Sequence, residues 1–239
     1  MQVKAVLFDL FDTLLLLEKD EAYYEPSLRR LHDFLVRNCI SASFEDFKRV
    51  YFEVRDELYM ETAESLEDPH FNVRISRVLQ RFGYNFDVSN PIVNGGTTAF
   101  GDEFIRRVRL DDDALDVLRK LSGKYKLGLV SNFVIPECVW KLLDKFGLGE
   151  FFDAVLVSAE INTRKPDPEI FERALKMLGV NASEAVVVGD TLGLDVKGAK
   201  NAGIRAILIE RRPTEEIVGA EPDRVISSLK ELFVLLEDC

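Results

Sequence analysis

The feature that most constrains the fold is an apolar strand that runs directly into a carboxylate. Residues 3–8 are mostly valine, alanine, leucine and phenylalanine, a composition typical of a central strand of a parallel sheet covered on both faces. The strand leads straight into Asp9, where a buried strand ordinarily ends in an apolar residue. Ligands of open parallel α/β sheets bind beyond the carboxyl ends of the strands. Asp9 is therefore the first candidate for chemistry.

The part of the chain after about residue 110 alternates between apolar strands and helices. Such repetition predicts a parallel sheet with right-handed crossovers, in a Rossmann-like α/β fold. The expected strands lie at 126–131, 154–158, 185–189 and 204–209, the expected helices lie at 111–121, 136–146, 168–178 and 195–202, and residues 225–226 lead into a final helix that runs through 236.

Between the first strand and this alternating part, the pattern is helical. Apolar residues recur at helical spacing in the stretches 28–36, 44–58 and 71–82, with Ser43 as an N-cap, Gly83 as a C-terminal glycine and Asp68-Pro69 as the break after the second helix. A fourth helix is expected to open at Asn90-Pro91, although Gly95 and Gly96 weaken it. Residues 17–104 are therefore expected to form an inserted helical bundle between core segments 1–16 and 105–239.

The overall composition narrows the classes of partner. The 239 residues carry a formal net charge of −11, whereas nucleic-acid binding needs a basic surface. No stretch has the apolar length of a membrane span or the pattern of a secretory signal. The three cysteines, Cys39, Cys138 and Cys239, show no paired spacing, so we expect neither disulfides nor structural zinc. We expect a cytoplasmic monomer or weak homodimer that binds neither nucleic acid nor membrane.

Polar and charged residues follow four of the expected strands. They are Asp9, Asp12 and Thr13 after the first, Ser131 and Asn132 at the end of the second, Lys165 after the third, and Asp190 and Asp195 after the fourth. A parallel sheet brings its strand ends to one edge, so these groups are expected to converge on one pocket. Oxygen ligands of this kind suit Mg²⁺, which usually keeps several waters and is rarely held by protein groups alone.

The order of these residues resembles that of a known enzyme family. Asp9-Leu10-Phe11-Asp12-Thr13, Ser131, Lys165, and Gly189-Asp190 with Asp195 are similar to the four ordered motifs of the haloacid dehalogenase-like (HAD) hydrolases. The inserted helical bundle resembles the C1-type cap domain of that family. Each motif alone is a weak signal, whereas four motifs in the right order are a strong one.

The resemblance implies a role for each matching residue. Asp9 would be the nucleophile that attacks phosphorus and forms an aspartyl-phosphate, because covalent catalysis divides one difficult displacement into two easier steps. Ser131 would hydrogen-bond a phosphoryl oxygen. The expected Mg²⁺ ligands are Asp9, the backbone carbonyl of Phe11, Asp190 and Asp195, the last two directly or through water.

Positive charge and hydroxyl groups would complete the site. The resemblance implies that Lys165 neutralises charge on the nucleophile and the phosphoryl group, and this cancellation is expected to dominate the lowering of the barrier. Thr13 would brace the loop through its hydroxyl. The segment 14–20 would be a mobile stretch that couples cap closure to the site. The residues expected to contact substrate are Phe11, Ser131, Asn132 and Lys165.

One position departs from the phosphatase pattern of the family. Phosphatases usually carry a second aspartate two residues after the nucleophile, whereas this chain has Phe11, which can neither protonate a leaving group nor activate water. Asp12 is a poor substitute if the segment is extended, because neighbouring side chains then point to opposite sides. An aromatic residue at this position also resembles the dehalogenase branch, whose halide leaving group needs no proton. The Asp190 and Asp195 pair favours the metal-dependent phosphatase form, because clustered carboxylates need a cation.

The sequence therefore predicts a Mg²⁺-dependent phosphatase that hydrolyses a small phosphorylated metabolite through an aspartyl-phosphate. The first alternative is a metal-independent 2-haloacid dehalogenase that uses the same Asp9. The second is a binding or regulatory protein that keeps the fold with little catalysis. Neither the substrate nor the group that replaces the missing acid follows from the residues. Arginines of the insertion such as Arg29 or Arg55 could bind a substrate carboxylate, but the pattern singles out none.

Overall fold

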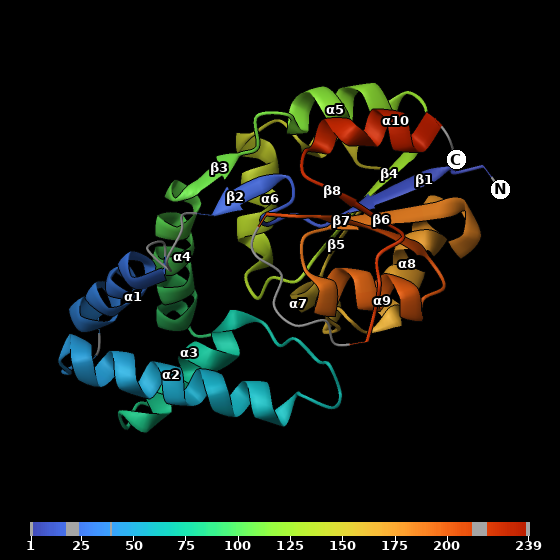
Figure 1. Cartoon of the computed structure of the whole chain (residues 1–239). Helices are drawn as coiled ribbons and strands as arrows, with labels where there is room; N and C mark the ends of the chain where they lie inside the picture. Colours follow the sequence, from blue (N-terminus) through green and yellow to red (C-terminus); the bar gives the residue numbers. More distant parts are fainter. Residues whose placement is uncertain (1, 18–23, 39, 212–218, 238–239) are drawn as a thin grey trace.

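The computed structural model describes residues 2–17, 24–38, 40–211 and 219–237. These residues form a six-stranded parallel sheet with helices on both faces and a helical bundle beside it (Figure 1). The strands lie in the order β5-β4-β1-β6-β7-β8. They span Ala5–Phe8 (β1), Lys126–Ser131 (β4), Ala154–Val157 (β5), Ala185–Gly189 (β6), Arg205–Ile209 (β7) and Arg224–Ile226 (β8). The predicted Rossmann-like α/β fold is confirmed.

Strand β1 lies in the middle of the sheet, as its composition indicated. It pairs in parallel with β4 on one side and with β6 on the other, and all four of its residues are fully buried. Val6 and Phe8 belong to one hydrophobic core, and Ala5 and Leu7 belong to the other. A strand covered on both faces requires this alternation. It places Asp9 at the carboxyl end of the central strand.

Helices that follow the strands cover the two faces of the sheet. Figure 1 shows α5 and α10 on one side of the sheet and α8 and α9 on the other. The bounds are Ala114–Ser122 (α5), Pro136–Lys145 (α6), Ser158–Ile161 (α7), Pro168–Leu178 (α8), Lys197–Asn201 (α9) and Leu232–Glu237 (α10), with 3₁₀ turns at Gly149–Phe151, Ala182–Glu184 and Leu229–Glu231. Helix α8 ends at Gly179 with a φ of 67°, the left-handed conformation that a C-terminal glycine adopts. The sequence predicted both ends of this helix.

The described residues of the insertion form a bundle of four helices. They are α1 (Tyr24–Asn38), α2 (Phe44–Glu61), α3 (Phe71–Arg81) and α4 (Pro91–Arg106). The Ser43 hydroxyl accepts the Asp46 N–H at 3.1 Å, which confirms the predicted cap of α2. Helix α2 ends at Glu61, before the Asp68-Pro69 pair that was expected to break it. The residues in between form a loop that contacts the core, where the Arg164 N–H donates to the Leu66 carbonyl at 2.9 Å.

Gly95 and Gly96 do not interrupt α4, although the sequence pattern suggested that they would weaken it. A Cβ on Gly95 would lie 2.3 Å from the ring of Phe34, and one on Gly96 would lie 2.9 Å from Leu31 Cδ1. The two glycines therefore let α1 approach α4 closely. This packing outweighs the lower helix propensity of glycine, which is about 1 kcal/mol per residue.

A two-stranded antiparallel ribbon joins the insertion to the core. Strand β2 (Leu15–Leu17) pairs with β3 (Val108–Leu110). Sequence reasoning missed both strands, because three residues are too few to show a periodicity. The ribbon places the exit of the chain from the core beside its return, close to the expected limits of the insertion. Within the segment 14–20 that was expected to be mobile, residues 15–17 form β2 and residues 18–20 lie outside the described residues.

The helix expected to begin at Asp111 begins at Ala114 instead. Asp111 accepts the N–H of Asp113 at 2.9 Å and forms an ion pair with Arg211 at 2.7 Å. The guanidinium of Arg211 also donates to the carbonyl of Thr13 at 3.3 Å. Asp111 therefore connects the ribbon to the segment after β7, and through Arg211 to the loop after β1.

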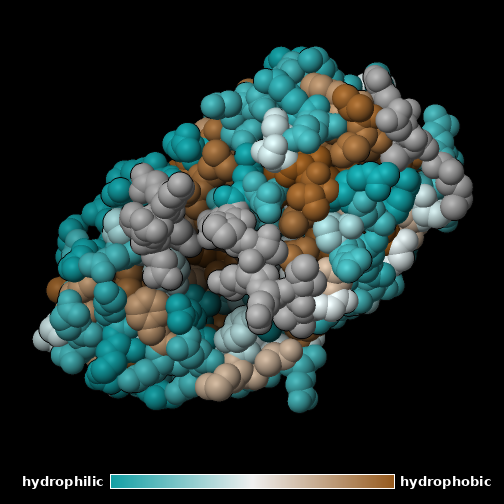
Figure 2. All heavy atoms as spheres, viewed as in Figure 1, coloured by the Kyte–Doolittle hydropathy of each residue, from teal (hydrophilic) through white to brown (hydrophobic). Residues whose placement is uncertain are grey.

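Hydrophilic residues dominate the face shown in Figure 2, and the hydrophobic residues visible there gather mainly over the part that holds the sheet. Within the described ranges, no helix is both long and apolar enough to cross a bilayer. Exposed ion pairs contribute little to stability, so the folded state depends mainly on the two hydrophobic cores.

We expect Phe171→Ala to lower the free energy of unfolding by about 3–5 kcal/mol, because truncating a buried phenylalanine leaves a cavity. Phe171 is fully buried in the core beneath α8. Met177→Ala is the matched control, since Met177 lies on the same helix and is 58% exposed. It should change stability by less than about 0.5 kcal/mol. Urea denaturation of both variants gives the comparison, and equal small changes would contradict the assignment of this core.

Candidate active site

The candidate site lies at the edge where the carboxyl ends of β1, β4 and β6 meet. Strand β1 leads into Asp9, β4 ends at Ser131, and β6 ends just before Asp190. Lys165 enters from the loop that follows β5 and α7. The parallel arrangement thus brings together residues that are far apart in the sequence.

The ammonium group of Lys165 is enclosed by three acceptors. Its Nζ lies 2.6 Å from Asp9 Oδ1 and 2.7 Å from Asp195 Oδ1, and it donates to the carbonyl of Val130 at 2.9 Å. Lys165 and Asp195 are each 2% exposed, and Asp9 is 8% exposed. A lysine has three N–H donors, so its hydrogen-bonding capacity is fully used. The predicted neighbourhood of Lys165 and Asp9 is present in the structure.

Asn132 holds the backbone of Lys165 in place. Its Oδ1 accepts the Lys165 N–H at 2.8 Å, and its Nδ2 donates to the Lys165 carbonyl at 3.0 Å. Both ends of the amide are therefore engaged with one residue, which positions the loop that carries the lysine. The sequence indicated Asn132 only as a substrate contact, and this positioning contact was missed.

Asp195 enters the site from an unusual local conformation. The sequence predicted a helix over 195–202, whereas the structure has a π-helical turn at Leu192–Val196 followed by α9. Single π turns of this kind are frequent at functional sites. The Oδ2 of Asp195 accepts the Thr191 N–H at 3.0 Å. Gly189 leaves room for the carboxylate, because a Cβ there would lie 2.3 Å from Asp195 Cγ.

Three carboxylates gather around the ammonium. One oxygen each from Asp9, Asp190 and Asp195 lies within 4.8 Å of the others. Burial raises the pKa of Asp9 to about 6 against the opposing effect of Lys165, and burial with the charges of Asp9 and Asp195 raises the pKa of Asp190 to about 7. Burial alone would lower the pKa of Lys165, but the Asp195 and Asp9 carboxylates raise it above its ordinary value. Among the described residues, one ammonium thus faces three acids, and this acidic cluster can hold a metal ion.

Two buried hydroxyl groups, one in the loop after β1 and one at the end of β4, have no hydrogen-bond partner among the described residues. They belong to Thr13 and Ser131, both fully buried. Buried polar groups are nearly always hydrogen-bonded, so each of these hydroxyls calls for a partner that a bound water, ion or ligand can supply. The brace that was predicted through the Thr13 hydroxyl is not formed within the described residues. The acidic cluster and the two orphaned hydroxyls together fit a hard cation and an oxyanion.

Phe11 adds apolar surface where the phosphatases of this pattern carry an acid. Its ring lies 4.8 Å from that of Phe133 and 5.6 Å from that of Phe104, between ring centroids, and these two rings are 4.9 Å apart. Asp12 has a left-handed backbone with φ 56°, and its Oδ1 accepts the Leu17 N–H at 3.2 Å. The assumption of an extended segment is wrong, because the loop after β1 turns before β2. Asp12 therefore takes part in holding that turn.

Sequence comparison relates the chain to phosphatases. The family model for haloacid dehalogenase-like hydrolases matches residues 3–203. Glyceraldehyde 3-phosphate phosphatase from Methanopyrus kandleri is 30% identical over 230 residues, which cover 93% of this chain and 91% of that protein. Phosphoserine phosphatase from Thermus thermophilus is 40% identical over 108 residues, which cover 45% of this chain and 43% of that protein. These relatives confirm the prediction of a hydrolase of the phosphatase class.

Solved structures show the same fold over the whole chain. A 2-haloacid dehalogenase from Pseudomonas syringae superposes with a TM-score of 0.75 at 25% identity and covers 99% of both chains. A HAD phosphatase from Thermococcus onnurineus superposes with a TM-score of 0.67 at 26% identity and covers 98% of both chains. With a family model that matches residues 3–203 and structural relatives of this kind, the chain belongs to the haloacid dehalogenase-like hydrolases.

Proposed function

We propose that this protein hydrolyses the phosphate ester of a small metabolite, with Asp9 as the nucleophile and Mg²⁺ bound at the acidic cluster. The observation that carries the proposal is the enclosed ammonium of Lys165, which touches Asp9 and Asp195, together with the two orphaned hydroxyls. A glyceraldehyde 3-phosphate phosphatase among the relatives supports a substrate of a few carbon atoms. We further propose residues 1–16 and 105–239 as the catalytic core and 17–104 as its cap.

The donor set suits the proposed metal. Asp9, Asp190 and Asp195, with the backbone carbonyl of Phe11, would hold the ion, and oxygen atoms are the ligands that Mg²⁺ prefers. When bound, Mg²⁺ supplies positive charge to the phosphoryl oxygens and to the acids. This charge compensates the carboxylates that Lys165 alone leaves unbalanced.

The side chains of the site act on the phosphoryl group in a defined order. A carboxylate oxygen of Asp9 attacks phosphorus, the bond from phosphorus to the ester oxygen breaks, and an aspartyl-phosphate forms on the protein. Lys165 keeps Asp9 ionised and offsets charge on the phosphoryl oxygens, while the buried Ser131 hydroxyl donates to one of them. Water then attacks phosphorus of the aspartyl-phosphate, releases inorganic phosphate and restores Asp9.

Phe11 makes the protonation steps of this chemistry slow. A phenyl ring packed on two other rings cannot donate a proton to a departing alkoxide. Substrates whose leaving group is stable as an anion, such as aryl and acyl phosphates, should therefore react faster than alkyl phosphates.

The second candidate is a 2-haloacid dehalogenase that uses Asp9 to displace halide from carbon. Phe11 and the fold similarity to the dehalogenase from Pseudomonas syringae favour it. The cluster of Asp190 with Asp9 and Asp195 opposes it, because halide displacement needs no cation. Release of halide from 2-chloropropionate, with no phosphate released from p-nitrophenyl phosphate, would establish the dehalogenase instead.

We expect phosphate release from p-nitrophenyl phosphate with Mg²⁺, loss of that activity with EDTA, and a fall of about 10³-fold or more in Asp9→Asn. The amide is no nucleophile at phosphorus, so the covalent step is lost. A colorimetric phosphate assay measures all three. Turnover that is unchanged in Asp9→Asn would contradict the proposed nucleophile. Absence of turnover in the unmodified protein would favour the hypothesis of a binding or regulatory protein.

We expect Phe11→Asp to raise turnover of alkyl phosphates, such as glycerol 3-phosphate, by up to about 10²–10⁴-fold, the usual contribution of general acid catalysis. Phe11→Leu is the matched control, because it removes the aromatic ring without adding an acid. The quantity to compare is the ratio of alkyl to aryl phosphate turnover in the three proteins. An alkyl rate in Phe11→Asp no higher than in Phe11→Leu would show that the missing acid is not the limitation.

We expect the affinity for Mg²⁺ to fall as the pH is lowered from about 8 to about 6, by roughly tenfold per pH unit for each proton that must leave. Asp190 and Asp9 have pKa values raised to about 7 and about 6, so protons compete with the metal in this window. The same raised pKa values make the stability of the metal-free protein depend on pH. Both acids hold their protons more tightly in the folded than in the unfolded protein, so the stability that they contribute is fully present below their ordinary pKa of 3.8. This stability is lost as the pH rises through about 6 and 7.

Titration calorimetry at several pH values measures this dependence and the protons released on binding. Asp190→Asn should weaken binding and reduce the number of protons released. Equal affinities at about pH 6 and about pH 8 would contradict a site made of these acids.

A further inference from the structure

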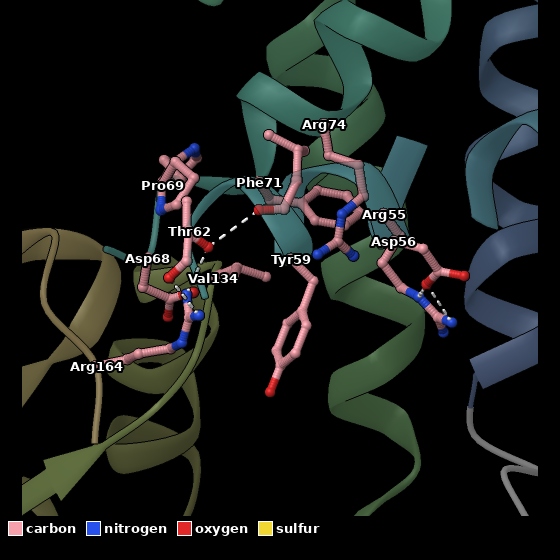
Figure 3. A pocket seen from close by; sticks show the side chains of 12 residues that line it. Arg55, Asp56, Tyr59, Thr62, Asp68, Pro69, Phe71, Arg74, Val134 and Arg164 are labelled. Atoms are coloured by element: carbon pink, nitrogen blue, oxygen red, sulfur yellow. Dashed lines mark hydrogen bonds and ion pairs between the residues drawn. The ribbon is translucent and has the colours of Figure 1, made fainter. Parts of the chain in front are cut away.

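A cavity of about 390 Å³ lies between the insertion and the core. Its walls are α2, the loop from α2 to α3, the start of α3, and two residues of the core, Val134 and Arg164 (Figure 3). Val134 follows the end of β4 at Ser131 by three residues, and Arg164 directly precedes Lys165. Both core residues of the cavity wall are therefore close in sequence to residues of the candidate active site.

The arginines that the sequence suggested for anion binding are already paired. Arg29 contacts Glu25 at 2.6 Å, and Arg55, which lines the cavity, contacts Asp56 at 2.7 Å. Each guanidinium therefore has a carboxylate beside it. Neither arginine needs a ligand to balance its charge.

Arg74 is different, because no carboxylate of the described residues lies within ion-pair distance of it. Its Nη1 donates to the hydroxyl of Tyr51 at 3.0 Å and, at 3.4 Å, to that of Tyr24, and its Nε is buried without an acceptor. The guanidinium also lies 5.3 Å from the ring centroid of Phe71. Tyrosine hydroxyls and rings are neutral, so they orient the guanidinium without an ion pair, and the carboxylate that acts on its charge is that of Asp68 in the same cavity wall. A buried donor without an acceptor in a native structure indicates a missing partner.

Arg164 adds a second guanidinium whose acceptors are all neutral. It donates to the Thr62 hydroxyl at 2.9 Å, to the Thr62 carbonyl at 2.9 Å and to the carbonyl of Glu67. Asp68 of the cavity wall accepts a hydrogen bond from the hydroxyl of Ser158 at 2.5 Å, and its carboxylate acts electrostatically on Arg164 and Arg74 without an ion pair to either. Figure 3 shows Arg74 and Arg164 reaching the cavity from the insertion and from the core, with Tyr59 between them. The cavity wall therefore holds these two guanidinium groups together with the Asp68 carboxylate.

We propose that this cavity binds a carboxylate at the far end of the substrate, and that Arg74 is its main contact. The inference rests on the proposed phosphatase function and narrows it to phosphorylated carboxylic acids. A carboxylate accepts charge-assisted hydrogen bonds from a guanidinium, and the two tyrosine hydroxyls engage only Nη1 of Arg74. Tyr59 is 66% exposed, with its ring 5.1 Å from the Arg164 guanidinium, and provides an apolar wall for the carbon chain.

The test compares pairs of phosphate esters that differ only at the far end. The pairs are 2-phosphoglycolate with 2-hydroxyethyl phosphate, 3-phosphoglycerate with glycerol 3-phosphate, and 6-phosphogluconate with glucitol 6-phosphate. Three chain lengths cover different separations between the two anionic groups. We expect kcat/KM to favour the acid of at least one pair by about 10–100-fold, the range for hydrogen bonds between charged groups.

In Arg74→Gln, the preference for the acid should fall to about one, because the amide keeps hydrogen-bonding capacity but carries no charge. Arg74→Lys keeps the positive charge but loses the planar guanidinium, so it should retain part of the preference for the acid. This variant replaces Arg74→Gln in the test if Arg74→Gln does not fold. Arg77→Gln is the matched control on the same helix, since Arg77 pairs with Glu61 at 2.7 Å and does not line the cavity. It should keep the full preference.

A direct binding measurement separates this inference from the proposed function. Calorimetry on Asp9→Asn with Mg²⁺ gives the Kd of each ester without turnover, and the acids should again bind more tightly than their partners. If p-nitrophenyl phosphate is hydrolysed but no pair shows a preference, or the preference survives in Arg74→Gln, the carboxylate site is wrong and the phosphatase stands. If no ester is hydrolysed but Arg74 still sets the preference in binding, the proposed function fails and the anion site stands.

Discussion

The ion pairs of the Lys165 ammonium with Asp9 and Asp195 are the interaction on which the rest of the site depends. Its three N–H groups are used by two carboxylates and a backbone carbonyl, in a place almost closed to water. A buried charge is tolerated only with such partners, and removing one partner of a buried pair costs about 3–5 kcal/mol. Two neighbouring residues support these ion pairs. Asn132 hydrogen-bonds the backbone of Lys165, and Gly189 leaves room for the Asp195 carboxylate. The proposed nucleophile Asp9, the ammonium of Lys165 and the candidate metal ligand Asp195 are thereby held at one edge.

The loop that carries Lys165 also attaches the proposed catalytic edge to the insertion. Arg164 precedes Lys165 and donates to Thr62 and Glu67, at and beyond the C-terminus of α2. Ser158, at the end of β5, donates to Asp68 of the same insertion loop and accepts the N–H of Phe133. The cavity that carries Arg74 and the edge that carries Asp9 are consequently connected through the segment Arg164-Lys165. The proposed carboxylate site and the proposed catalytic edge therefore belong to one connected structure.

The sequence predicted those parts of the fold whose signals are local. Buried strands ending in polar residues, and helices bounded by proline and glycine, place β4, β6 and α8 at the observed residues. What it missed depends on distant contacts. Strands β2 and β3 exist because they pair with each other, and α4 continues through Gly95 and Gly96 because α1 packs closely against them. The π turn before α9 brings Asp195 to the site.

The same distinction between local signals and distant contacts applies to the residues of the candidate site. Asp9, Ser131, Lys165 and Asp190 follow strands, so topology alone brings them together. Arg74 carries no sequence signal, because the neutral hydrogen-bond partners of its guanidinium, unlike the carboxylates beside Arg29 and Arg55, are visible only in the structure. Asn132 and Asp12 were assigned from strand geometry, whereas the local backbone turns them toward Lys165 and Leu17. The role of such residues depends on tertiary contacts, so the sequence pattern alone does not predict it.

The central claim is that Asp9 attacks phosphorus, and mass spectrometry of protein quenched with acid during turnover of p-nitrophenyl phosphate tests it most directly. Phe11 supplies no base to activate water, so the second step should be slow and the aspartyl-phosphate should accumulate. The account predicts a phosphoryl group on the peptide that contains Asp9, removable by hydroxylamine and absent from Asp9→Asn. A phosphoryl group on another residue, or steady turnover with Asp9 unmodified at every quench time, would contradict it.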